Sequence, residues 1–281
     1  MKKMKIFSIG LVALFATGLI IYSSCKKHED EQQNNYRAAQ DNATAEGAFN
    51  RSYSEIQKAA RQVGSKSTND TIGSCPTIYI GSGWPKTVTL DYGTSGCLCN
   101  DGVTRKGQIV TIMTGLYIDS ASVTTSTFTN FSETINNVQH NITGTQTITN
   151  LGHNGAGHPH FSVDVQNASI SYSEGTINWT SQRENEWIAG YDTYMNPFDD
   201  EYAVTGSANG TDINGAAFTV NITSALICKY CLSIYRWTIT SGTLDIVNPG
   251  YPNITVDYGN GDCDLIVYVT VNGTTYTIVL T

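Results

Sequence analysis

Short runs in which apolar and polar residues alternate fill the chain from Cys75 onward. Residues 108–113, 161–165 and 218–222 are clear examples. A period of two residues is typical of a strand with one buried face. Turn-forming pairs such as Asn272-Gly273 separate these runs, and such pairs favour tight hairpins. The pattern therefore predicts many short strands joined mainly by short turns.

This spacing leaves little room for the crossover helices that a parallel sheet needs. We therefore expect an all-β domain, in which an antiparallel meander forms either a β-sandwich or an open curled sheet. The alternation alone does not separate these two architectures. An open curled sheet with an apolar concave face would favour lipid as cargo.

Residues 43–62 carry a helical pattern ahead of the strands. Apolar side chains recur there at i, i+4, i+7 and i+11, namely Phe49, Tyr53, Ile56 and Ala60. Ser54, Glu55 and Lys58 help supply a polar face. We expect one short amphipathic helix packed on the β domain. The stretches 26–42 and 64–70 are polar, which predicts a tether over 25–74 and a single all-β domain over 75–281.

The N-terminus is typical of an export signal. Three lysines among the first five residues precede an uncharged apolar run over 6–21, which is shorter than the roughly 20 residues of a spanning helix. The run leads to Tyr22-Ser23-Ser24-Cys25, which resembles the lipobox of bacterial lipoproteins. We expect a signal peptide over 1–24 and a membrane anchor of lipid on Cys25. A conventional cleaved signal followed by a chance cysteine is the alternative.

The charged residues bear on where the protein is located and on which partners it can bind. The cluster at 26–31 resembles the surface-export signal of Bacteroidota lipoproteins, although a solvated tether explains it equally well. We expect a lipid-anchored protein of the outer membrane, at the cell surface or on the periplasmic face. The formal net charge is −8 and no basic patch is apparent, which argues against nucleic acid as a partner.

Six cysteines follow Cys25, and an even number outside the cytoplasm favours disulfides. The candidates are Cys75, Cys97, Cys99, Cys228, Cys231 and Cys263. The sequence does not choose among the 15 pairings that six cysteines allow, although a turn near Trp84-Pro85 favours Cys75 with Cys97. Two alternatives are a zinc site made by Cys97, Cys99, Cys228 and Cys231, and a redox pair of Cys228 with Cys231.

Other candidate sites are weaker. Oxygen ligands in an acidic loop, Asp192, Asn196, Asp199 and Asp200, predict calcium binding, with a solvated turn as the alternative. His153, His158 and His160 offer imidazoles for zinc or copper. Glu184 and Glu186 share one face of a strand and are candidates for glycosidase carboxylates.

Two hydroxyl groups are candidates for O-glycosylation. Asp70-Thr71-Ile72 and Asp119-Ser120-Ala121 each have an Asp, then Ser or Thr, then a small or apolar residue. That pattern resembles the acceptor motif of exported Bacteroidota proteins. Thr71 ends a polar linker and Ser120 lies in a predicted turn, so both sites are expected at the surface.

Several motifs together resemble a family of Bacteroidota lipoproteins without an assigned activity. They are Cys75-Pro76-Thr77, Asp91-Tyr92-Gly93, residues 101–107, residues 186–192 and Asp257-Tyr258-Gly259. The resemblance implies export and a β domain, and it supplies no catalytic residues. We therefore expect a non-catalytic binding or structural domain with a glycan, protein or lipid ligand. The alternative is a secreted hydrolase that acts on glycans.

Overall fold

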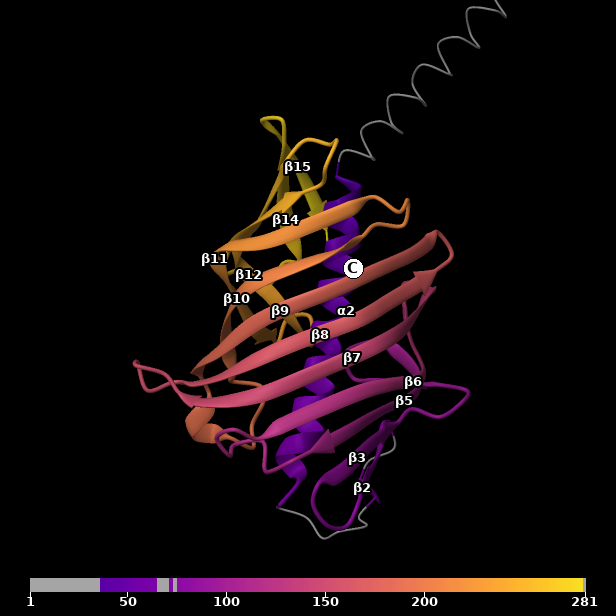
Figure 1. Ribbon diagram of the computed structural model, residues 1–281, viewed down its shortest axis with the longest axis vertical. Helices are drawn as coiled ribbons and strands as arrows, with labels where there is room; N and C mark the ends of the chain where they lie inside the picture. Colours follow the sequence, from indigo (N-terminus) through magenta and orange to yellow (C-terminus); the bar gives the residue numbers. More distant parts are fainter. Residues whose placement is uncertain (1–35, 65–70, 73–74, 280–281) are drawn as a thin grey trace, which may run out of the picture.

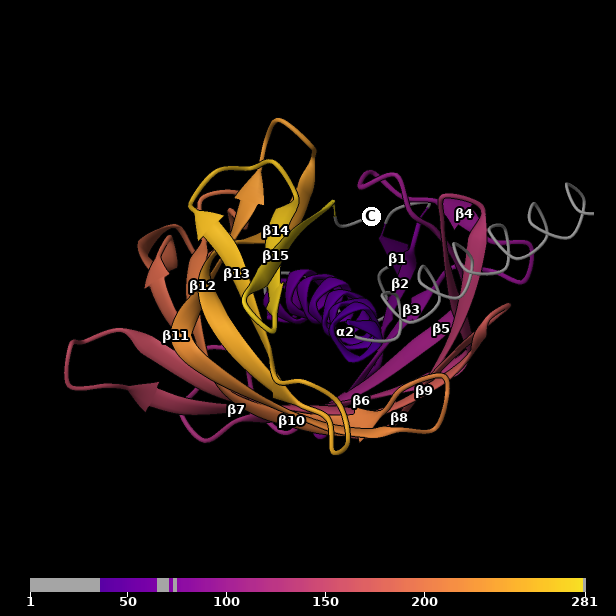
Figure 2. The ribbon, with the colours of Figure 1, turned by 90° about the horizontal axis from the view of Figure 1, so that it is seen from above.

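One antiparallel sheet curls around one helix (Figures 1 and 2). This computed structural model describes residues 36–64, 71–72 and 75–279. The expected all-β meander with a preceding helix is confirmed, and the sheet is open and curled rather than a sandwich. The predicted signal peptide over 1–24 and Cys25 lie outside the described residues.

The elements follow one another in chain order. The helix is α2 (Arg37–Gln62), and a short 3₁₀ helix, η1 (Tyr191–Thr193), lies between β9 and β10. The strands are β1 (Thr71–Ile72), β2 (Thr77–Ile80), β3 (Lys86–Asp91), β4 (Cys97–Leu98), β5 (Thr104–Met113), β6 (Val123–Ile135), β7 (Val138–His153), β8 (Pro159–Tyr172), β9 (Gly175–Ala189), β10 (Glu201–Thr211), β11 (Ala217–Cys231), β12 (Arg236–Val247), β13 (Ile254–Asn260), β14 (Ile266–Val271) and β15 (Thr274–Val279).

Strand order in the sheet follows the sequence from β1 to β15. Every strand pairs antiparallel with its neighbour in the chain, except that β3 pairs with β5 and the short β4 also pairs with β5. Alternation along a strand decides what faces the helix. In β9, for example, Trp179, Arg183 and Trp187 are buried, and the intervening Glu184 and Glu186 face outward.

Glycines with positive φ lie where strand pairing shifts register. Gly107 in β5, Gly144 in β7, Gly206 in β10 and Gly242 in β12 each coincide with such a shift. At Gly206, φ is +113° and a Cβ atom would lie 2.2 Å from the carbonyl oxygen of Gln182, so no larger residue fits. Bulges bend strands and increase their twist. Their repetition in four strands explains how the sheet curls around α2.

Helix α2 lies inside the curled sheet and has no solvent-exposed polar face. It begins at Arg37 instead of residue 43, and none of its residues is exposed. The predicted polar face is therefore wrong: Ser54 is buried, and Glu55 and Lys58 are only partly accessible. The reason is that the curled sheet wraps around most of the helix and leaves one side open, as the view from above shows (Figure 2). No helix in the described residues has the length and apolar character needed to cross a bilayer.

Polar side chains of α2 are matched by partners on the sheet. Three such contacts are Glu46 with Arg183 at 2.5 Å, Arg51 with Glu133 at 2.8 Å, and Asn42 with the indole nitrogen of Trp179 at 3.1 Å. Burying charged and polar groups is unfavourable unless they find such partners. These contacts therefore fix the rotation and depth of the helix inside the sheet.

Candidate functional site

A cavity of about 520 Å³ lies between α2 and the inner face of the C-terminal strands. Its sheet wall combines β10 to β15 and includes Val204, Cys228, Ile239, Val256, Val267, Val269 and Ile278. Val138 and Val279 also line it and are exposed, so the cavity reaches the surface. Its size falls within the range of small-molecule binding sites.

The sheet wall is buried although none of the side chains that the structure describes fills the space in front of it. Val204, Val256, Val267 and Val269 are each at most 5% exposed, yet all four line the cavity. Protein interiors are normally packed so closely that few voids exceed the size of a water molecule. A cavity of this size with an apolar sheet wall is therefore an exception to ordinary core packing, and such a wall offers contacts to the apolar part of a ligand.

The facing side of α2 explains why the space is open. Short side chains recur along it at helical spacing, namely Ala39, Ala43, Gly47, Asn50 and Ser54, and all of them line the cavity. The larger Phe49 instead packs against Phe128 and Trp179 on the other side of the helix. Sequence reasoning missed the cavity, although this stripe of short residues is a signal from which it could have been found.

Several polar atoms at the cavity lack partners. The indole nitrogen of Trp237, Nε of Arg236 and Oδ1 of Asn185 are buried and make no hydrogen bond with any described residue. Buried polar atoms are almost always paired in folded proteins. Two of these three atoms are donors, so the cavity offers hydrogen bonds to an acceptor group on a ligand.

A buried polar network adjoins the cavity at Tyr53 and Gln57. The Tyr53 and Tyr117 hydroxyls lie 2.9 Å apart, and the Gln57 amide donates to the Tyr117 and Tyr202 hydroxyls. Burial raises the pKa values of Tyr53, Tyr117 and Tyr202 well above 10. These hydroxyls are therefore neutral at physiological pH, and they serve as hydrogen-bonding supports rather than as bases.

Arg61 joins this network to the acidic loop. Its guanidinium group pairs with Asp200 at 2.5 Å and lies 4.5 Å from the ring centre of Trp187. Burial raises the pKa of Asp200 to about 6, although the Arg61 charge opposes that shift. Asp200 thus points inward to α2, where it pairs with Arg61, and it is not available as the calcium ligand that the sequence predicted.

The other predicted calcium ligands remain in the loop after β9. Asp192 and Asn196 are exposed, and Asp199 accepts a hydrogen bond from Thr193 at 2.7 Å. Among the described residues, just one cluster of three or more His, Cys, Asp or Glu side chains has donor atoms within 4.8 Å of one another, and it consists of Cys75, Cys97 and Cys99. The structure therefore does not gather the acidic loop into a cation site.

Four of the six candidate cysteines form two disulfides. Cys75 is bonded to Cys97, the pair that the hairpin argument favoured, and Cys231 is bonded to Cys263. Cys99 and Cys228 are free thiols, so their expected disulfides are absent. Cys228 lines the cavity, and burial raises its pKa to about 12. The four-cysteine zinc site and the Cys228–Cys231 redox pair are therefore wrong, because both Cys97 and Cys231 have other partners.

The remaining candidates lie away from the cavity. Glu184 and Glu186 are on the outer face of β9, where Glu186 accepts hydrogen bonds from Asn154 and His158 at 2.8 and 2.7 Å. Ser120 is exposed in the turn between β5 and β6, as expected of a modification site. Thr71 lies in β1, paired with Tyr79.

Comparisons with known proteins identified no relative of this chain. A scan against protein-family models found no match, and neither curated proteins nor solved structures matched the chain. The cavity and its chemistry therefore carry the functional argument.

Proposed function

We propose that the protein binds one amphiphilic ligand in the cavity between α2 and strands β10–β15. The supporting observation is the cavity of about 520 Å³, with a buried apolar sheet wall, that no described side chain fills. The ligand has an elongated apolar body, for which the valine-rich wall of β13 and β14 supplies contacts. This reading makes the domain a carrier or receptor for lipid-like molecules rather than an enzyme.

The unpaired hydrogen-bond donors of the cavity indicate which polar group the ligand carries. Arg236 and Trp237 begin β12 and line the cavity, and the Arg236 side chain forms no ion pair with a described residue. A carboxylate is a strong acceptor for such donors, because charge-assisted hydrogen bonds are the stronger kind. The preferred ligand is therefore a fatty acid or a lipid with a comparable anionic group.

Displacement of a fluorescent fatty acid by unlabelled carboxylic acids of increasing length tests this proposal. Each buried methylene contributes about 0.8 kcal/mol, which corresponds to roughly fourfold in affinity. We expect affinity to rise by that factor per carbon and to level off once the cavity is full. Absence of saturable binding at every chain length would contradict the proposal.

Two variants locate the binding site. Val269→Trp fills the cavity from β14 and should weaken binding at least tenfold, whereas Ile112→Trp on the outer face of β5, where Ile112 is 50% exposed, should leave it unchanged. Arg236→Gln should weaken binding of a fatty acid more than binding of the alcohol with the same chain. Equal affinities for wild type and Val269→Trp would place the ligand elsewhere.

We also propose that lipid on Cys25 anchors the domain to the outer membrane. The basic start, the short apolar run and the lipobox-like Tyr22-Ser23-Ser24-Cys25 support this assignment. Two or more acyl chains hold a protein stably at a membrane. The anchor would keep the cavity close to the source of amphiphilic ligands.

A further inference from the structure

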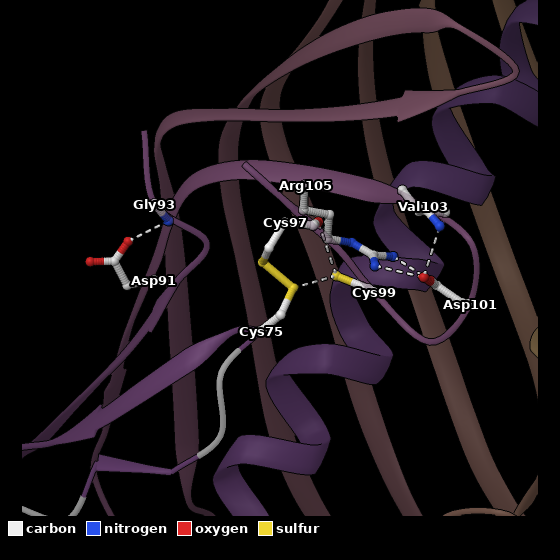
Figure 3. The surroundings of a disulfide bond; sticks show 8 residues. All are labelled: Cys75, Asp91, Gly93, Cys97, Cys99, Asp101, Val103 and Arg105. Carbon is white, nitrogen blue, oxygen red and sulfur yellow. Dashed lines mark hydrogen bonds and ion pairs between the residues drawn. A yellow bond between two sulfur atoms is a disulfide. The ribbon is translucent and has the colours of Figure 1, made fainter. Parts of the chain in front are cut away.

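Three cysteine sulfur atoms meet beside the first hairpins of the sheet (Figure 3). Cys75 and Cys97 form a disulfide, and the free thiol of Cys99 lies 3.3 Å from the sulfur of Cys75. Figure 3 shows the Cys75 sulfur between the other two. This contact brings a nucleophile to an existing disulfide without any movement of the chain.

We propose that Cys75, Cys97 and Cys99 form a thiol–disulfide exchange site in which Cys75 pairs alternately with Cys97 and Cys99. The Cys99 thiol loses its proton, and its thiolate attacks the Cys75 sulfur. The Cys75–Cys99 bond forms as the Cys75–Cys97 bond breaks. The electron pair leaves with Cys97, which takes up a proton. Neither an oxidant nor a reductant is consumed.

Local backbone structure lets both cysteines reach the same target. Cys97 and Cys99 are two residues apart, so their side chains project to one side of the extended chain. Their sulfur atoms lie within 4.8 Å of each other. The Cys99 amide donates to the Val103 carbonyl at 2.9 Å, so a tight turn holds Cys99 in place. Exchange therefore requires rotation of side chains rather than unfolding of β5.

Burial, Glu55 of α2 and Asp101 oppose ionisation of Cys99, and Arg105 favours it. Arg105 lies next to the Cys99 thiol and is itself held by Asp101 at 2.6 Å and by Glu133 at 2.9 Å. Burial nevertheless raises the pKa of Cys99 above its usual value, because it outweighs the Arg105 charge. The thiolate is thus a minor species at neutral pH. Below the pKa of Cys99, the exchange rate should rise about tenfold for each unit by which the pH increases.

Pulsed labelling of the full-length chain carrying Cys25→Ser and Cys228→Ser tests the exchange. Light N-ethylmaleimide traps free thiols in the native protein at pH 6, 7 and 8, and heavy reagent labels the remaining thiols after reduction. Tryptic cleavage places Cys75 on peptide 67–86 and both other cysteines on peptide 87–105, so fragment ions must distinguish Cys97 from Cys99. We expect light label on Cys97 and none on Cys75.

Two further variants make the outcome decisive. Cys99→Ser removes the nucleophile, so Cys97 should take no light label at any pH. Cys97→Ser should yield peptides 67–86 and 87–105 joined by a Cys75–Cys99 disulfide. The proposal is overturned if Cys97 stays unlabelled at all three pH values, or if Cys97→Ser leaves Cys75 and Cys99 as free thiols. Stoichiometric zinc bound by three reduced cysteines would overturn it as well.

Discussion

The ion pair between Glu46 of α2 and Arg183 of β9 should be one of the most sensitive points of the fold. Two hydrogen bonds, at 2.5 and 3.3 Å, join the side chains, and neither side chain is more than 4% exposed. Among the described residues, no other carboxylate pairs with Arg183. Glu46→Gln keeps the size of the side chain but leaves the Arg183 charge buried without a counter-charge.

The expected magnitude follows from burial. Opposite charges about 4 Å apart attract by about 4 kcal/mol at an effective dielectric constant of about 20. Removing one partner of a buried pair costs roughly 3–5 kcal/mol, because the remaining charge stays desolvated. We therefore expect Glu46→Gln to lower the free energy of unfolding by about that amount. Replacing both residues, with Glu46→Leu and Arg183→Met, should restore most of the loss, since no charge is then buried.

Denaturant titrations of the ligand-free protein measure this effect through the midpoint, with an unchanged slope. The control is Glu174→Gln in the pair with Arg37, where the contact distance is 2.7 Å but the Glu174 side chain is 59% exposed. That change should cost less than about 1 kcal/mol. The reasoning is refuted if Glu46→Gln costs no more than the control, or if the double variant is less stable than Glu46→Gln.

Three other predictions follow from single positions. Gly206→Ala forces a Cβ atom against the backbone of β9 and should cost at least about 2 kcal/mol, whereas Gly155→Ala, with open space around it, should be neutral in the same melts. The pKa of Asp200 is raised to about 6 from about 3.9 in the unfolded chain, so its neutral form stabilises the fold below pH 4 and this stability is lost as the pH rises through 6. Asp200→Asn should remove that dependence, and its free energy of unfolding relative to wild type should shift by about 3 kcal/mol across the window. Cys25→Ala should abolish palmitate incorporation and release the protein from membranes; unchanged labelling would disprove the lipid anchor.

The sheet was predictable from sequence because its signal is local. Alternation marks the strands, and turn residues such as Asn272-Gly273 mark the hairpins. The enclosure of α2 was not predictable, because its sheet partners, such as Arg183, lie more than a hundred residues away in the chain. The periodicity of Phe49 and its neighbours indicated a helix but not how many of its faces are covered.

The candidate sites also divide into those that depend on residues close in sequence and those that depend on distant ones. The Cys75–Cys97 pair spans a short hairpin, so a local argument reached it. Cys231 and Cys263 are joined across β12 and β13, and sequence could not choose that partner. The cavity depends on short residues of α2 facing valines that follow about 200 residues later, which requires knowledge of how the sheet curls.

The polar character of α2 bears on how the protein assembles. The helix precedes every strand that encloses it, so it is synthesised before its partners. A purely apolar segment in that position would be prone to aggregate before its partner strands form. Glu46, Gln57 and Arg61 make the unpaired helix less apolar, and in the folded protein the same groups contact Arg183 on β9 and Tyr202 on β10. Because most strands pair with their neighbours in sequence, the sheet can grow strand by strand around the helix.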